Sequence, residues 1–348
     1  MVGNTQDRAG RVSARIRAIA THVPEYILDN DALAALFPEW TAAKIEEKLG
    51  IRERRLAAPD ETAADLAYQA AEKLFASHAC DRSSVDFVIL CTQAPDYILP
   101  TTACLLQERL GLPTTVGAFD INLGCSGFVY GLAVASGLIA SGAAERVLLL
   151  TADTYSKFIH PKDRSIRTLF GDGAAATLIE AAPGADSAIG PFVFGTDGSG
   201  ARSLIVETGA ARRPRTAESA VAVPDAAGNV RAQDDLYMNG AGVMSFSLRT
   251  VPPTVDALLA KAGMERDQIS QYVLHQANKF MLDALQKALQ LSPTKLPRHF
   301  AETGNTVSST IPFVLERLMT DERTEAGSTM MLVGFGVGLS WAAGLVRF

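Results

Sequence analysis

The stretch VGAFDINLGCSGFVYGLAVASGLIA, residues 116–140, joins an apolar strand to a long helix and carries no charge after Asp120. Val116 to Ile121 has the length of a buried strand. From there to Ala144 no residue is charged, and Gly, Ser and Ala are frequent. The run is long enough to span a bilayer, but no positively charged loop flanks it. We therefore expect a helix buried on all sides within an α/β core, and no membrane span.

Strand and helix patterns alternate on both sides of this stretch. Such alternation predicts a largely parallel sheet covered by helices. A capping box at Thr62 and Asp65 marks the start of one helix, and the polar, aperiodic segment 207–235 indicates a surface excursion. We expect strands at 15–23, 85–92, 116–121, 146–151, 174–179 and 271–276, one more from about residue 188, and helices at 30–36, 42–49 and 103–110. Two successive α/β halves, 1–186 and 187–348, account for the length, and the second ends in an apolar hairpin around glycines.

Composition narrows the class of protein. The chain has 348 residues, of which 48% are hydrophobic and 20% charged, which is enough for a large core. A net charge of −6 without a long basic tract argues against nucleic-acid binding. The polar start shows no signal peptide, so we expect a cytoplasmic protein. The four cysteines are Cys80, Cys91, Cys104 and Cys125, and they have no CxxC spacing, which argues against a metal site. We expect Cys80, Cys91 and Cys104 to be packing residues.

Cys125 is the exception. It lies between the strand and the uncharged helix, and the positive end of a helix dipole favours a thiolate. Gly124 and Gly127 allow a sharp turn and close approach of a substrate. A buried, inert cysteine is the alternative interpretation, and the local sequence leaves both open.

Two further polar residues suit thiol chemistry. His275 follows an apolar run in VLHQAN, where α/β proteins place their sites. Asn305 lies in GNTVSS, a turn entering a helix. Taken alone, each has a structural explanation, as a hydrogen-bonded histidine or a cap. Together with Cys125, however, an imidazole and an amide can stabilise a developing oxyanion.

Two glycine-rich strings remain. FGDGAAA, residues 170–176, lacks the ending of a phosphate-binding loop, so we do not expect a nucleotide there. GFGVG, residues 334–338, forms a turn between two apolar runs. Its backbone N–H groups could serve an oxyanion hole, or the turn could simply close a hairpin.

These strings together resemble the beta-ketoacyl-acyl-carrier-protein synthase III family of the thiolase superfamily. The resemblance extends from about Arg15 to Phe348 and includes GIRERR at 50–55, LFGDGA at 169–174 and LVRF at 345–348, besides the segments of Cys125, His275 and Asn305. It implies a five-layered α-β-α-β-α fold from two similar halves, and a cytoplasmic homodimer. It implies no cofactor, with acyl-CoA as a substrate.

The resemblance also implies a mechanism. Cys125 would take the acyl group from acyl-CoA, and malonyl-acyl carrier protein would then lose CO2. His275 and Asn305 would stabilise the resulting enolate, whose attack on the acyl-cysteine gives a 3-ketoacyl product. The amide groups of Cys125 and of the Val337 region would hold the tetrahedral oxyanion, and Phe335 would line the decarboxylation site. These steps belong to fatty-acid or specialised lipid biosynthesis.

Binding contacts follow from the same resemblance. Trp40 and Arg164 match a pair that stacks on the adenine of CoA, with Lys48 nearby. Leu99 stands where the family places the residue that caps the acyl pocket of the other subunit. Departures affect the docking of a carrier protein: three positions that are polar or basic in typical members are Ala241, Ser245 and Phe280 here. Lys279 and Lys287 remain as basic contacts.

Three other functions compete with this prediction. The altered docking positions suit a related enzyme of a natural-product or polysaccharide pathway that transfers acyl groups to a non-malonyl acceptor. A hydroxymethylglutaryl-CoA synthase fits less well, because the context of Asn305 indicates decarboxylation. A non-catalytic partner subunit would usually have lost the cysteine.

Overall fold

Two β-sheets form the framework of the molecule. The computed structural model describes residues 13–182, 188–321 and 325–348. The first sheet has the strand order β1-β7-β6-β4-β5 and the second β13-β14-β15-β8. Their strands are β1 (Ser13–His22), β4 (Phe87–Cys91), β5 (Gly117–Ile121), β6 (Arg146–Asp153), β7 (Gly173–Ala182), β8 (Ile189–Thr196), β13 (Gln271–Leu274), β14 (Thr329–Gly336) and β15 (Ser340–Arg347). The predicted boundary between residues 186 and 187 lies outside the described residues.

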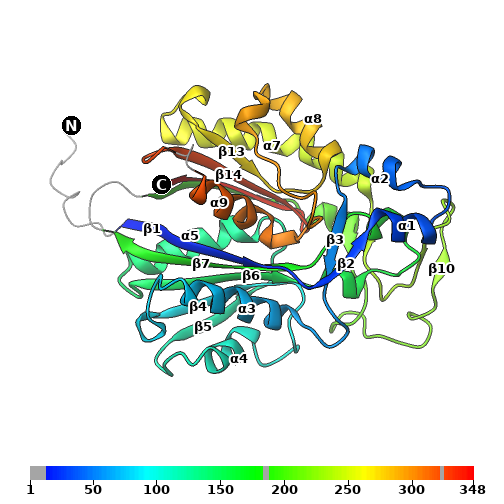
Figure 1. Cartoon of the computed structure of the whole chain (residues 1–348), viewed down its shortest axis with the longest axis horizontal. Coiled ribbons are helices and arrows are strands. Elements are labelled where there is room, and N and C mark those ends of the chain that lie inside the picture. The colour runs from blue at the N-terminus through cyan, green and yellow to red at the C-terminus, as the bar shows by residue number, and fades with distance from the viewer. Residues whose placement is uncertain (1–12, 183–187, 322–324) are drawn as a thin grey trace.

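The helices and the two sheets form five layers (Figure 1). α3 (Ala63–Ala76) and α4 (Thr102–Arg109) cover the outer face of the first sheet, and α7 (Gly240–Ala262) and α8 (Lys279–Leu289) cover the second. Between the sheets lie α5 (Gly127–Ala140) and α9 (Thr310–Thr320). The predicted α-β-α-β-α fold is confirmed.

The sheets are mixed, so the prediction of a largely parallel sheet was wrong. Only the pairs β4–β5, β4–β6 and β13–β14 are parallel, whereas the other four pairs of these sheets are antiparallel. A parallel return needs a crossover of a dozen or more residues, usually a helix. Residues 337–339 are too few for one, so β15 turns back beside β14.

The central helix explains the uncharged stretch of sequence. α5 is shorter than expected because residues 122–126 form a loop that carries Cys125. It contacts strands of both sheets, and Phe128, Leu132 and Ile139 are buried. A charge on this helix would meet apolar surface in either direction. Among the described residues no helix has both the length and the apolar character needed to cross a membrane.

The hairpin of β2 (Tyr26–Asp29) and β3 (Glu53–Leu56), with α1 (Asn30–Leu36), α2 (Ala42–Leu49) and β10 (Val223–Pro224), lies at one end of the molecule (Figure 1). The hairpin encloses α1 and α2. The predicted capping box of α3 is present, with Asp65 N–H donating to Thr62 Oγ1 over 3.3 Å. Further short elements are α6 (Arg164–Arg167), β9 (Leu204–Ile205), β11 (Val230–Arg231) and β12 (Tyr237–Met238). Turns of 3-10 helix lie at 82–84, 155–158, 198–203, 266–268, 293–295 and 307–309.

Candidate active site

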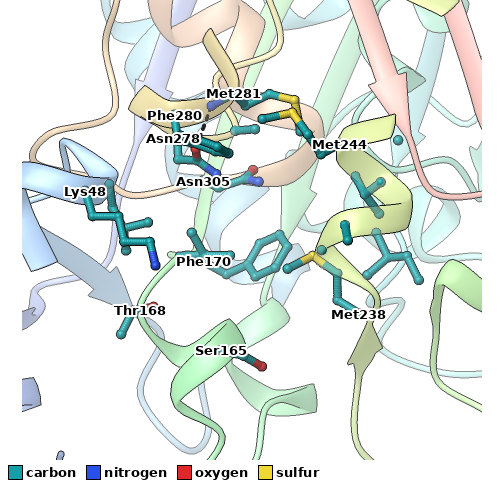
Figure 2. A pocket seen from close by; sticks show the side chains of 18 of the residues that line it. Lys48, Ser165, Thr168, Phe170, Met238, Met244, Asn278, Phe280, Met281 and Asn305 are labelled. Carbon is teal, nitrogen blue, oxygen red and sulfur yellow. Dashed lines mark hydrogen bonds between the residues drawn. The ribbon is translucent and has the colours of Figure 1, made fainter. Parts of the chain in front are cut away.

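One pocket of about 920 Å³ brings together residues from both halves of the chain. We call its buried end the floor, which consists of Cys125, His275, Asn305, Phe335 and Gly336. The mouth is the outer part, lined by Trp40, Lys48, Arg164, Met244 and Phe280. Figure 2 shows Lys48 at the left of this pocket, Asn305 at its upper side and Phe170 near its centre.

Cys125 lies on the floor between β5 and α5 and is only 5% exposed. Two glycines of β14 make room for it. A Cβ on Gly336 would lie 3.0 Å from the Cys125 sulfur, and one on Gly334 would lie 2.7 Å from its carbonyl oxygen. Since real Cβ atoms rarely approach other atoms so closely, β14 can pass this loop only with glycine at these positions. The glycines of the string GFGVG therefore give Cys125 its space.

The electrostatics of Cys125 contradict the expectation of a thiolate. Burial raises the pKa of the thiol, and the nearby Asp153 raises it further. The backbone N–H of Cys125 lowers this pKa, but by less. The helix dipole falls off within the first turn, and α5 begins two residues later, so desolvation dominates. At rest, Cys125 is therefore a thiol.

His275 follows β13 and is 2% exposed. Its backbone N–H donates to Val333 O over 2.8 Å, and its Nδ1 lies 2.7 Å from Thr310 Oγ1. Burial lowers its pKa to about 3, so the imidazole is neutral at physiological pH. The Thr310 hydroxyl donates to Val307 O over 3.2 Å, so it accepts from Nδ1–H of the imidazole, and Nε2 carries the free lone pair. With Nδ1 engaged, Nε2 is the ring nitrogen available to a substrate.

Asn305 lies where the second half of the chain contacts the first. Its backbone N–H donates to Leu169 O over 2.9 Å, and Gly171 N–H donates back to Asn305 O over 3.1 Å. Its side-chain oxygen accepts from Val307 N–H over 2.9 Å, which leaves the Nδ2 donors for the pocket. A Cβ on Gly171 would lie 2.0 Å from Thr303 O. The FGDG string, for which the sequence suggested no role beyond the resemblance, thus fixes the position of Asn305.

Cations surround the Trp40 ring at the mouth. Lys48 Nζ, Lys44 Nζ and Arg164 Cζ lie 4.9, 5.6 and 5.4 Å from the ring centroid. Arg164 also pairs with Glu39 and donates to Ala227 O over 3.3 Å. The structure therefore brings together the three residues that the resemblance assigned to CoA. Lys44 was missed, although its position one helical turn before Lys48 could have indicated it.

The other predicted residues lie in different places. Val337 packs against the Cys125 loop, where its Cγ1 would be 2.7 Å from a Cβ on Gly124. Leu99 is 79% exposed and does not line the pocket of its own chain. Lys279 is paired with Asp283 at 2.5 Å, and Lys287 is exposed on the same helix; neither lines the pocket. Ala241, Ser245 and Phe280 do line it.

Several lining residues were not predicted from the sequence. Phe170, Met238, Met244 and Met281 project into the pocket in Figure 2. Methionine side chains adapt to irregular shapes, but a single sequence does not separate them from core residues. Ala227 and Asn229 also line the pocket, so the segment 207–235 is in part a pocket wall and only in part a surface excursion. Cys104 is exposed, contrary to the expected packing role.

Comparisons with known proteins agree with this geometry. The model of 3-oxoacyl-[acyl-carrier-protein] synthase III matches residues 119–198, and its C-terminal counterpart matches residues 259–348. A beta-ketoacyl-[acyl-carrier-protein] synthase III of Deinococcus deserti is 36% identical over 99% of this chain and 94% of its own. The chain belongs to the beta-ketoacyl-[acyl-carrier-protein] synthase III family.

Solved structures of the synthase III family agree in fold. A crystal structure of a 3-oxoacyl-(acyl-carrier-protein) synthase III is 60% identical, with a TM-score of 0.95, over 97% of this chain and 100% of its own. A 3-oxoacyl-(acyl-carrier-protein) synthase of Burkholderia xenovorans is 37% identical, with a TM-score of 0.88, over 97% of this chain and 96% of its own. The family membership and the enzyme type expected from the sequence are confirmed. In the described ranges no group of three His, Cys, Asp or Glu residues is arranged to hold a metal.

Proposed function

We propose that the chain condenses an acyl-CoA with a malonyl thioester, with loss of CO2, through an acyl group on Cys125. The observation that carries the proposal is the meeting of Cys125, His275 and Asn305 on the floor of one pocket. A sulfur nucleophile can accept an acyl group and then give it up to carbon. The polar groups beside it are neutral hydrogen-bond donors, which suits an enolate.

The first half-reaction forms the acyl-enzyme. The Cys125 sulfur attacks the thioester carbonyl, the bond from that carbon to the CoA sulfur breaks, and CoA leaves as a thiol with the proton of Cys125. His275 is the base within the pocket that can pass this proton, because its neutral imidazole has one free lone pair in the appropriate tautomer. The backbone N–H of Cys125, which points towards its own sulfur, stabilises the oxyanion of the tetrahedral intermediate.

The second half-reaction makes the carbon–carbon bond. The bond from the malonyl methylene to its carboxylate breaks, CO2 leaves, and the electron pair forms an enolate at the thioester. Donors on His275 Nε2 and Asn305 Nδ2 stabilise the enolate oxygen. In this step the imidazole is the Nε2–H tautomer, and the Thr310 hydroxyl donates to Nδ1 instead of to Val307 O. The enolate carbon then attacks the acyl-cysteine, and the released thiolate takes one proton from solvent.

The mouth suits a donor with a nucleotide. Trp40 offers an aromatic face, and Lys44, Lys48 and Arg164 supply positive charge for phosphates. The apolar walls between the mouth and the floor suit a pantetheine arm. We assign acyl-CoA as the first substrate and malonyl-acyl carrier protein as the second, with Lys279 and Lys287 as basic contacts for the carrier.

A homodimer is part of the proposal. β5 is the terminal strand of the first sheet, so one of its edges is free to pair with another chain. The loop with Tyr97, Ile98 and Leu99 exposes 61%, 90% and 79% of these side chains. Apolar groups of this size are rarely left in water. In the dimer Leu99 would cap the acyl pocket of the other subunit. The environment we propose is the cytoplasm.

One observation favours a second function. Ser245 and Phe280 line the mouth where the sequence comparison expected basic docking residues, and Phe280 is 61% exposed. The absence of basic side chains at these two positions suits an acceptor other than malonyl-carrier protein, as in natural-product pathways. Product formation with hydroxyl or amine acceptors, together with inertness towards malonyl thioesters, would establish that function.

Intact-protein mass spectrometry with a panel of acyl-CoAs tests the proposal. We expect a mass gain equal to the acyl group in the wild type and none in Cys125→Ala. Addition of a malonyl thioester should then remove the acyl group and yield a 3-ketoacyl thioester. A protein that is never acylated by any acyl-CoA or acyl-carrier donor would exclude the mechanism and favour a non-catalytic partner role.

A further inference from the structure

The turn after Asn305 is strained. Val307 has a φ of 55°, in the left-handed region that β-branched residues avoid. A residue held there costs about 1–3 kcal/mol unless its surroundings fix it. The Val307 N–H donates to Asn305 Oδ1 over 2.9 Å. The strained conformation is therefore coupled directly to the direction in which the Asn305 amide points.

Asp153 holds this turn from the other half of the chain. It lies at the end of β6 and is fully buried. Its Oδ2 accepts from Ser308 N–H over 3.3 Å and from Ser308 Oγ over 2.5 Å. The next residue, Ser309, donates to Thr151 O on the same strand over 3.0 Å. In the described part of the chain no Lys, Arg or His forms an ion pair with Asp153.

The other carboxylate oxygen of Asp153 faces the cysteine loop. Oδ1 accepts from Gln93 N–H over 2.8 Å. The Gln93 side chain accepts from Tyr155 and donates to Asn122 Oδ1 over 3.3 Å, three residues before Cys125. One buried carboxylate therefore connects the turn that orients Asn305 with the loop that carries the nucleophile.

We propose that Asp153 is a positioning residue, which anchors the strained turn at Ser308 and so directs the Asn305 amide towards the malonyl thioester. The inference rests on the proposed function, because it assumes that Asn305 stabilises the enolate. A buried carboxylate without an ion-pair partner is costly. Burial accordingly raises its pKa to about 7. Retaining such a group makes sense if it accepts three hydrogen bonds that no neutral side chain of this size can all accept.

The charge of Asp153 has a separate effect on Cys125. It opposes a second negative charge and helps to raise the pKa of the thiol. An amide at position 153 would remove the charge and place donors opposite the donors of Ser308. Asp153→Asn should therefore slow decarboxylation and, at the same time, leave the thiol as reactive as before or more so. Loss of structure alone would also slow decarboxylation, but it would expose the buried thiol to alkylation and lower the melting temperature. Each variant is therefore compared at a temperature at which its melting curve shows it to be folded.

The experiment compares the two readouts in one set of variants. Release of CO2 from malonyl-CoA measures decarboxylation, the step in which Asn305 acts. Alkylation of Cys125 by iodoacetamide at about pH 8 measures the reactivity of the thiol, and peptide mass spectrometry quantifies the product. At this pH Asp153 is mostly ionised. In Asp153→Asn we expect decarboxylation to fall about tenfold or more, with alkylation unchanged or faster. In Ser308→Ala, which keeps the charge, we expect a fall of about threefold in decarboxylation and unchanged alkylation.

A matched control comes from Glu316 on α9. Its partly buried carboxylate also accepts from a backbone N–H and a hydroxyl of one residue, but both belong to Thr21 on β1. Glu316→Gln should lower the melting temperature without changing the ratio of decarboxylation to alkylation. The inference is overturned if Asp153→Asn decarboxylates within twofold of wild type, or if both rates fall together. Should that variant not fold, the same two criteria apply to Ser308→Ala. Unchanged decarboxylation in Asn305→Ala would instead refute the proposed function.

Discussion

The floor and the mouth of the pocket are built in different ways. On the floor, His275 and Asn305 are buried and each is held by hydrogen bonds from the backbone or from a buried hydroxyl. At the mouth, Lys48 and Phe280 are exposed, and the Trp40 ring is contacted by flexible cations. The floor is therefore fixed in geometry and tolerates little change. Exposed side chains at the mouth, such as Lys48 and Phe280, should tolerate substitution better, because surface changes usually alter stability little.

The largest effect should come from the floor. Asn305→Ala removes a donor to the enolate, and loss of one such donor costs on the order of 10²–10³-fold in rate. We expect that loss in CO2 release from malonyl thioesters, while acylation of Cys125 continues. The measurement is CO2 release beside intact-protein mass. Equal losses in both would show that Asn305 serves the fold and not the enolate.

The second prediction concerns the space around the nucleophile. In Gly336→Ala the new methyl would lie 3.0 Å from the Cys125 sulfur. Overpacking of this kind costs about 1–3 kcal/mol, and if this strain is felt at the sulfur, acylation should fall about five- to 150-fold. Gly137→Ala is the control, because a Cβ at this position of α5 meets nothing within 4 Å. Similar acylation rates in the two variants would argue against a close fit at β14.

The third prediction applies to the mouth. Trp40→Ala removes the ring that the three cations surround, and we expect KM for acyl-CoA to rise about tenfold with little change in kcat. The same acyl group on pantetheine, which lacks the nucleotide, provides the control. If KM rises equally for both donors, Trp40 shapes the channel and does not contact the nucleotide.

The smallest effect is expected at the docking position. Phe280→Arg restores a basic side chain at the mouth, which should favour an acidic carrier protein. Rim charges act weakly, so KM for a malonyl-carrier substrate should fall only about threefold, and only at low salt. Malonyl-CoA should show no such change. A decrease that persists in high salt would indicate a change of shape instead of charge.

Local patterns predicted much of the fold. The bounds of α1 and α2, the capping box of α3 and the buried character of α5 all follow from short-range sequence. The direction of neighbouring strands did not, because pairing such as β7 beside both β1 and β6 depends on residues far apart in the chain. The prediction of a largely parallel sheet failed for this reason.

The candidate site shows the same limit. Cys125, His275 and Asn305 could be singled out by residue type and by resemblance. The raised pKa of Cys125 could not be predicted in this way, because both the residues that bury the thiol and Asp153 lie in elements distant in sequence. The strained Val307 is likewise invisible in GNTVSS, because only the finished packing holds a valine in that conformation.

The chain has only two tryptophans, Trp40 and Trp341. Trp341 packs against Phe246 within the second half, with ring centroids 5.8 Å apart, whereas Trp40 lies at the mouth among its cations. The protein thus contains its own optical reporter. Arrival of a nucleotide should alter the emission of Trp40 while Trp341 supplies a constant background. Donor binding can therefore be followed in unlabelled protein, without turnover, and Trp40→Phe identifies which signal belongs to the mouth.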